Sequence, residues 1–229
     1  MNHFGAIVGA ARISGAEEIL LVGDINQLPY IDRDNLFDMF YRSPSQIVKI
    51  NQDLLCTHRS PMDVAYALQE IYFGIYSSKK VVHSLRIENL RTTPAPRDLR
   101  ETLYLTFTQE EKKSLIHQGY GVNIGSKVLT IHEAQGLSNA TVIIVNTKST
   151  KLQLHDSVSH AIVAITRHTD RCSYYTSGDD DAIKRLIRKA TEATTKGIAE
   201  YNLKMAIKDR NEAVMSSILA VMPSTSHFP

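Results

Sequence analysis

Cysteine and long apolar runs are scarce in this sequence, and each shortage excludes a class of protein. Of the 229 residues only Cys56 and Cys172 are cysteines, too few for a disulfide scaffold, and no basic segment followed by an apolar one opens the chain. We therefore expect a reducing, cytoplasmic setting. The apolar stretches are short and interrupted, well below the roughly 20 residues that a membrane-spanning helix needs, so we expect no membrane span.

Net charge is also small, because the formal value is +2 at neutral pH. This is too little to serve as a nucleic-acid signature, so any such contact must come from the local placement of Lys and Arg. Composition neither supports nor excludes a nucleic-acid partner. With 43% hydrophobic and 22% charged residues, the chain has the composition of an ordinary globular protein of one or two domains.

Short apolar runs alternate with helical patterns, and this order predicts an α/β fold built on a parallel, doubly wound sheet flanked by helices. Residues 18–22 are an apolar run ending at Gly23-Asp24, which predicts a buried strand that delivers a polar loop at its carboxyl end. Further strands are expected at residues 103–107, 127–131, 141–145 and 172–176, and helices at residues 61–74 and 157–167.

A helix from residue 109 to about His117 is predicted by its N-terminal sequence. Thr108 begins the pattern T-Q-E-E, a capping box in which the Thr hydroxyl and the Glu111 carboxylate satisfy each other's exposed amides. Residues 84–100 contain two prolines and little periodicity, which predicts a surface connection around an edge strand.

Residues 181–229 predict a helical tail of one or two helices, because apolar residues recur at helical spacing and Gly and Pro nearly vanish until Pro223. The acidic run at residues 179–181 is more typical of a helix N-terminus than of a cation site. Basic residues are interspersed with the apolar ones: Lys184, Arg185, Arg188, Lys189, Lys196 and Lys204. They could track a nucleic acid, although a solvated helix face is the more ordinary interpretation.

Four segments occur in an order that is more specific than any of them alone. They are LLVGDINQLP at residues 20–29, CTHRSP at 56–61, TIHEAQG at 130–136 followed by the apolar TVIIV at 141–145, and AITRH at 164–168. Together they resemble motifs III, IV, V and VI of superfamily 1 helicases. The likeness is strongest to the helicase region of alphavirus-like plus-strand RNA virus replicases of the tobamovirus type.

The resemblance covers roughly residues 1–190 and implies a RecA-like fold in three parts. Residues 1–50 would be the C-terminal remnant of a first RecA-like domain, and residues 51–180 the second RecA-like helicase domain. Residues 181–229 would be a helical C-terminal extension. The boundary between the first two parts is expected near residues 45–55.

Two parts of such a helicase are missing from the sequence: a Gly-x-x-x-x-Gly-Lys-Ser/Thr loop and an acidic Asp-Glu pair at a strand end. The segment MNHFG at residues 1–5 resembles the chain immediately after the acidic motif II. The resemblance therefore implies the C-terminal portion of an ATP-dependent RNA helicase, an NTPase whose ATP and Mg²⁺ are held mainly by the missing first domain. The isolated chain is expected to be inactive. Its implied partners are single-stranded or duplex RNA and the first domain or the rest of a replicase polyprotein.

Arg167 is the residue that the resemblance assigns to an arginine finger reaching the nucleotide. A guanidinium suits this task because it stays charged and grips phosphate oxygens in two places. Thr166 and His168 would help to place it. The alternative is a cation that caps a helix C-terminus.

Arg59 and Gln27 resemble two further residues that face the triphosphate. Arg59 matches the motif IV arginine, for which a surface salt bridge is the alternative. Gln27 matches the motif III glutamine, whose amide would sense the terminal phosphate, together with Gly23 and Asp24 of the same loop. Otherwise this loop is a plain polar turn.

The segment around Gly136 combines implied nucleotide and RNA contacts. Gln135 and Gly136 would present backbone amide to phosphate, while Thr130 and His132 would face RNA. The alternative is a strand-to-helix turn that needs glycine for its conformation. Thr106 and Thr108 likewise resemble residues that grip the RNA backbone, although helix capping explains Thr108 without RNA.

No metal site is expected, because Cys56 and His58 lack a second Cys/His pair at finger spacing. The competing hypothesis for the whole chain is a non-catalytic RNA-binding or protein-interaction module derived from a viral helicase. Such a module would keep Thr130, His132 and the basic tail and would not need Arg167.

Overall fold

The computed structural model describes residues 3–28, 49–148, 150–178, 180–220 and 222. Of the residues discussed above, Met1, Asn2, Pro29, Asp179 and Pro223 lie outside these ranges. The chain divides into two compact units, Met1–Asp53 and Leu54–Pro229. Within the described part of the first unit, helix α1 (His3–Ile13) is the regular element. The three-part division at residues 50 and 180 stays a prediction.

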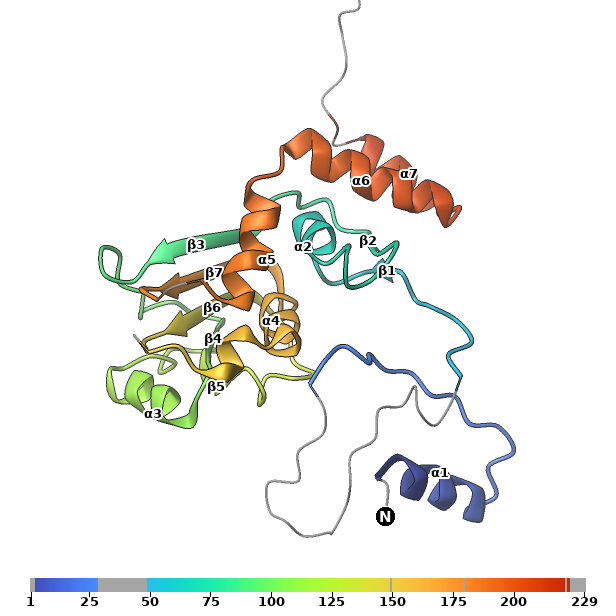
Figure 1. Cartoon of the computed structure of the whole chain (residues 1–229), viewed down its shortest axis with the longest axis horizontal. Coiled ribbons are helices and arrows are strands. Elements are labelled where there is room, and N and C mark those ends of the chain that lie inside the picture. Colours follow the sequence, from blue (N-terminus) through green and yellow to red (C-terminus); the bar gives the residue numbers. More distant parts are fainter. Residues whose placement is uncertain (1–2, 29–48, 149, 179, 221, 223–229) are drawn as a thin grey trace, which may run out of the picture. The chain divides into compact units, whose positions relative to one another are not determined.

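The second unit is built on a five-stranded sheet in which every neighbouring pair of strands is parallel (Figure 1). Its order is β3-β7-β6-β4-β5. The strands are β3 (Leu85–Asn89), β4 (Thr102–Thr106), β5 (Lys127–Thr130), β6 (Asn139–Asn146) and β7 (His168–Thr176). The predicted α/β fold with a parallel sheet is therefore confirmed, and β3 is the edge strand expected within residues 84–100.

The centre of this sheet is apolar on both faces, because helices cover a parallel sheet on its two sides. Strand β6 shows this directly, since Val142, Ile143, Ile144 and Val145 are all buried. On one face, Ile143 and Val145 belong to a cluster with Leu115 of α3 (Gln109–His117). The capping box at Thr108 and Glu111 is present as predicted.

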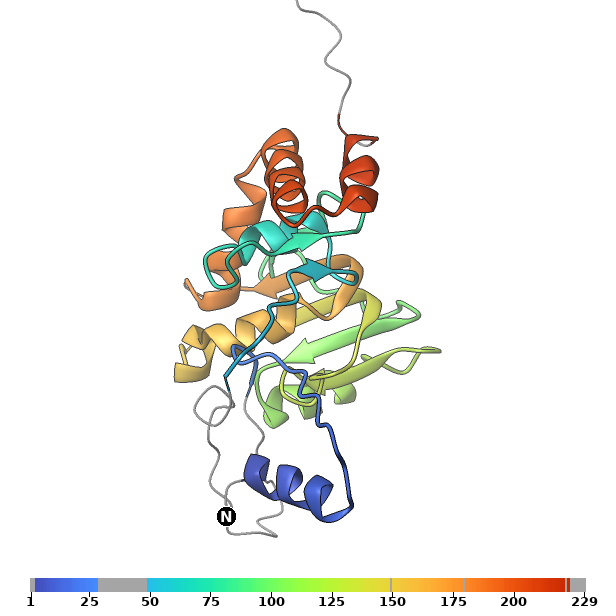
Figure 2. The same ribbon diagram turned by 90° about the vertical axis from the view of Figure 1, so that its right-hand side faces the viewer.

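Three helices pack against one another beside the sheet (Figures 1 and 2). They are α2 (Met62–Ala67), α4 (Val158–Ile165) and α5 (Ala182–Thr191), and α5 contacts both α2 and α4. A short 3₁₀ helix, η2 (Gln153–Asp156), precedes α4. Helix α4 is apolar almost all round, with residues 161–165 buried without interruption, as expected of a helix enclosed in the core.

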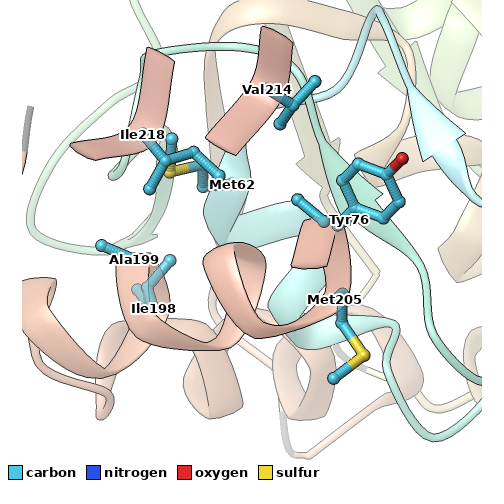
Figure 3. Close-up of a cluster of buried hydrophobic side chains, with 8 residues drawn as sticks. Met62, Tyr76, Ile198, Ala199, Met205, Val214 and Ile218 are labelled. Atoms are coloured by element: carbon cyan, nitrogen blue, oxygen red, sulfur yellow. The ribbon is translucent and has the colours of Figure 1, made fainter. Parts of the chain in front are cut away.

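The C-terminal helices α6 (Thr195–Lys208) and α7 (Glu212–Leu219) pack on the small parallel pair β1 (Cys56–Thr57) and β2 (Tyr76–Ser77) and on α2. Figure 3 shows the apolar cluster that joins them, in which Met62 and Tyr76 meet residues of both helices. Asn202 of α6 strengthens this contact, because its amide accepts from the Ser77 backbone N–H (2.8 Å) and donates to the Met62 carbonyl (3.2 Å).

The described part of the tail contains three helices, so the expectation of one or two was wrong. The divisions fall at polar N-cap residues, because Asp181, Thr194 and Asn211 each accept a hydrogen bond from the backbone N–H three residues later. These caps begin each new helix without Gly or Pro.

Two other expectations were wrong. Residues 18–22 form no strand, and Leu20 and Val22 are 88% and 73% exposed. A strand needs a neighbour for its backbone groups, and no other described segment pairs with this one. Helix α2 ends at Ala67, well before Gly74, and its continuation is a series of turns closed by Gly74 at a φ of 87°.

Candidate functional site

The candidate residues of the second unit fall on two opposite edges of the sheet. Thr106 and Thr130 end β4 and β5 at the carboxyl edge, where they are paired with each other. His168 begins β7 at the amino edge, so Arg167 lies there too. Thr106 is level with Tyr175 of β7, well after His168, so these two groups lie about 20 Å apart along the strands. The structure therefore separates the predicted RNA contacts Thr106 and Thr130 from the predicted arginine finger.

Arg167 lies between the end of α4 and the start of β7, and its side chain is only 1% exposed. Its Nη2 donates to the Thr166 hydroxyl (2.9 Å), and that hydroxyl donates to the Ile162 carbonyl of α4 (2.7 Å). The Arg167 carbonyl accepts from the Asn139 N–H (2.9 Å). The backbone of Arg167 is thus held by β6 and its guanidinium by the last turn of α4.

Arg59 lies in the short connection between β1 and α2 and is half-buried. The Thr57 hydroxyl accepts from the backbone N–H groups of Arg59 (3.4 Å) and Ser60 (3.1 Å), which fixes the turn that carries the guanidinium. Burial lowers the pKa of Arg59. Among the described residues no carboxylate forms an ion pair with it, so the surface salt bridge that was the alternative is not present there.

His168 lies close enough to Arg59 for their charges to interact, and its side chain is fully buried. The pKa of His168 is lowered to about 4, mainly by burial; the Ile165 backbone raises this pKa, and the positive charge of Arg59 lowers it. At neutral pH the imidazole is uncharged. The structure therefore brings the motif IV arginine and the motif VI segment together, although they are separated by over a hundred residues in the sequence.

Gly136 follows Gln135 in an exposed turn between β5 and β6. Its φ is 85°, a backbone conformation that favours glycine, and nothing lies within 4 Å of the position a Cβ would take. The turn therefore needs glycine for its conformation, as the alternative interpretation held. The same open surface leaves the backbone accessible to a ligand.

Glu133 organises the loop that contains Thr130 and His132, and sequence reasoning gave it no role. Its carboxylate accepts from the Thr130 N–H (2.8 Å), Gln109 Nε2 (2.9 Å) and Lys112 Nζ (2.9 Å). Burial raises the pKa of Glu133, but these donors outweigh burial and lower it to about 2. The Thr130 hydroxyl accepts from the Glu133 N–H (3.2 Å), so the spacing T-x-x-E was the signal for this pair.

The predicted RNA-facing hydroxyls are all used within the chain. Thr106 is fully buried and donates to the Thr108 carbonyl (3.2 Å), and Thr130 is 4% exposed. Thr108 caps α3. His132 is half-buried near His160 of α4, whose pKa is lowered first by burial and then by His132. Helix capping thus accounts for Thr108, and an RNA role for these residues stays a prediction.

Gly23, Asp24 and Gln27 belong to the first unit. The Asp24 carboxylate accepts from the Asn26 backbone N–H (3.0 Å) and from Gln27 Nε2 (2.8 Å). These bonds make the polar turn that was the alternative interpretation of this loop. The role of Gln27 as a phosphate sensor is untested and stays a prediction.

The basic residues of the tail are largely matched by acidic ones. Asp180 accepts from Arg185 (3.0 Å) and Arg188 (3.1 Å), and Lys189 lies 2.7 Å from a Glu70 carboxylate oxygen. This pairing favours a solvated, ion-paired face over a free basic track. Asp181 caps α5, as the acidic run predicted. Among the described residues no cluster of His, Cys, Asp or Glu could hold a metal ion, and no helix is long and apolar enough to cross a membrane.

The comparison with known proteins assigns the chain to a family. A model of the viral superfamily 1 RNA helicase core domain matches residues 1–176, so the chain belongs to this family, and the parallel sheet flanked by helices is its RecA-like architecture. Similar proteins include the replicase large subunits of tobacco rattle virus (strain SYM) and turnip vein-clearing virus. They are 30% and 34% identical over 88% and 77% of this chain.

The chain spans only 12% and 11% of the length of these two curated relatives. Among solved structures, an arterivirus nonstructural protein 10 helicase is 17% identical. The match covers 72% of this chain and 34% of that chain, with a TM-score of 0.41. The chain is thus a viral helicase-family domain of the kind found within replicase proteins.

Proposed function

We propose that this chain is the C-terminal portion of an ATP-dependent viral RNA helicase and supplies Arg167 and Arg59 to a nucleotide held by a first RecA-like domain. The observation that carries the proposal is that α2, which the Arg59 turn begins, is joined to the Thr166–His168 segment at the amino edge of the sheet, because the Ser84 hydroxyl contacts both Asp63 of α2 (2.7 Å) and His168 (2.8 Å). Charge on a transferred phosphoryl group spreads over several oxygens, and fixed guanidinium groups stabilise that charge.

The surroundings of the two arginines support this role. Arg59 is partly desolvated and has no carboxylate partner among the described residues. A guanidinium in that state interacts more strongly with phosphate than one that is already paired or fully hydrated. The open turn at Gly136 leads from the carboxyl edge to Asn139 of β6, which is bonded to Arg167, and so reaches the same edge of the sheet.

The described residues fit the phosphate groups of ATP but not its metal ion. They offer the half-buried guanidinium of Arg59 and the accessible backbone at Gly136, and they hold no carboxylate cluster for Mg²⁺. We therefore propose that Mg²⁺ and most ATP contacts belong to the first domain, that the isolated chain hydrolyses ATP negligibly, and that Gln27 senses the terminal phosphate. We also keep the proposal of a reducing, cytoplasmic setting.

For RNA we propose the carboxyl edge of the sheet, where the loop of Thr130 and His132 follows β5. Glu133 ties this loop to α3 through Gln109 and Lys112, so the loop is presented on a rigid support. Thr106 and Thr108 support the same edge from within, since Thr106 bonds the Thr108 carbonyl and Thr108 caps α3. Placing RNA and nucleotide at different edges would allow both to bind at once.

The test is RNA-stimulated ATP hydrolysis by this chain alone and by a mixture with a family first domain that carries the phosphate loop. Activity is expected only in the mixture. Arg167→Ala should lower kcat by about 10²-fold or more, because it removes transition-state charge stabilisation. Arg86→Ala is the matched control, because Arg86 is an exposed arginine on the edge strand β3.

Three results would contradict the proposal. Hydrolysis by the purified chain alone would show that the phosphate-binding machinery is not confined to a first domain. RNA binding without hydrolysis in the mixture would favour the non-catalytic RNA-binding module. An equal decrease of kcat in Arg167→Ala and Arg86→Ala would contradict the role of Arg167 as an arginine finger.

A further inference from the structure

Asp63 is a buried carboxylate that joins the start of α2 to the start of β3. It is 2% exposed. Its Oδ1 accepts from the Val64 N–H (2.9 Å) and the Ser84 hydroxyl (2.7 Å), and its Oδ2 accepts from the backbone N–H groups of Ser84 and Leu85. A carboxylate with this many donors makes strong, directional contacts.

Ser84 extends this connection to His168. The Ser84 hydroxyl is 2.8 Å from His168 Nε2, and both residues are buried. A hydroxyl has one proton, and here that proton is donated to Asp63. The imidazole must therefore donate from Nε2–H to the serine oxygen, which selects one tautomer of the neutral ring.

The two ends of this hydrogen-bonded series lie beside the two arginines. Asp63 is four residues after Arg59, in the helix that the Arg59 turn begins, and His168 directly follows Arg167. The segments that carry the arginines directly precede α2 and β7, which are remote in sequence. The series Asp63–Ser84–His168 joins these two elements directly through side chains.

We propose that Asp63, Ser84 and His168 are positioning residues that hold the Arg59 and Arg167 segments in one relative arrangement, so that both guanidinium groups reach the same triphosphate. The triphosphate belongs to the proposed function, on which this part of the inference rests. Catalytic groups must be held within about 0.5 Å of their working positions, and a displacement of about 1 Å lowers rates by up to about 10²-fold.

The hydrolysis experiment compares Ser84→Ala with Ser126→Ala in the mixture with the first domain. Ser126 is a matched control, because it is also buried, donates to a backbone carbonyl (Leu99, 2.7 Å) and accepts from a backbone N–H (Thr102, 3.2 Å). Ser84→Ala should lower kcat by about 10-fold or more with little change in the KM for ATP, since the arginines act mainly on the transition state.

The control separates positioning from a general loss of stability. Both variants lose one buried hydroxyl, so both should lower the melting temperature, but Ser126→Ala should leave kcat within about twofold of the wild type. His168→Gln keeps a donor near the Nε2 position and should retain more activity than His168→Ala. Equal losses of kcat in Ser84→Ala and Ser126→Ala would overturn the proposal.

A second measurement needs no hydrolysis and uses the chain alone. In ¹⁵N NMR, the wild type should show the neutral Nε2–H tautomer of His168 at pH 7. Hydrogen exchange of the Arg167 Nε–H should be faster in Ser84→Ala by about 10-fold or more and unchanged in Ser126→Ala. An unchanged exchange rate of the Arg167 Nε–H in Ser84→Ala would overturn the positioning role. If the wild-type mixture shows no hydrolysis, the proposed function fails, and this measurement alone decides whether the series positions Arg167.

Discussion

At the scale of the residue, Glu133 makes the loop after β5 sensitive to acid. Its folded-state pKa of about 2 lies below the ordinary 4.5, so its contribution to stability is fully present above about pH 4.5 and is lost as pH falls towards 2. After a discount for solvent screening, this contribution is about 1–2 kcal/mol. The free energies of unfolding of the wild type and Glu133→Gln, measured with urea, should differ most at pH 6–7. The difference should become smaller as the pH is lowered below 4.5. A difference that stays constant across this range would contradict the assignment.

Thr108 provides a second prediction at this scale, because two interpretations of it can be separated. As the N-cap of α3, its hydroxyl accepts from the Glu111 N–H (3.2 Å). Thr108→Ala should lower the free energy of unfolding by about 1–2 kcal/mol and leave the affinity for single-stranded RNA unchanged. Thr92→Ala, at an exposed turn, is the control. Reduced RNA affinity at unchanged stability would favour the RNA-gripping role.

Only part of the candidate site could be predicted from the amino-acid sequence. The pattern T-Q-E-E specified the capping box because all its contacts lie within one turn. By contrast, the contact between Ser84 and His168 spans 84 positions, and no local pattern indicates it. Glu133 lay within a recognised motif, but its partners Gln109 and Lys112 come from helix α3, which precedes it by about 20 residues in the sequence.

At the scale of the element, α6 should behave as part of the core of the second unit. Ile198 is fully buried in the cluster of Figure 3, whereas Ile207 of the same helix is 55% exposed. Ile198→Ala should lower the free energy of unfolding by about 2–4 kcal/mol, and Ile207→Ala by less than about 0.5 kcal/mol. Chemical denaturation measures both. Small, equal effects would show that α6 is a loosely attached tail.

The elements show where sequence patterns succeed and fail. The strands of the sheet were found because apolar runs such as residues 141–145 are buried on both faces. The run at residues 18–22 has the same character but no described partner, and a strand exists only through its neighbours. Strand β7 begins at His168, four residues earlier than expected, because pairing with β6 extends it through polar residues.

At the scale of the whole molecule, one sheet presents different groups at its two edges. The amino edge carries Arg167 and His168 with the nearby Arg59 turn, and the carboxyl edge carries the Thr130–Glu133 loop. Strands β6 and β4 run between these edges and form the core.

The second unit should fold without the first. Every strand among the described residues, and the apolar clusters around Leu115 and Ile198, lie within Leu54–Pro229. A chain of residues 54–229 should unfold in one transition, with a Tm within about 5 °C of the full chain. Residues 54–193, which lack α6 and α7, should lose more than about 10 °C because Met62 and Tyr76 lose their apolar cover. Calorimetry measures both chains. If the first truncation lowers the Tm as much as the second, the core of the second unit depends on residues 1–53.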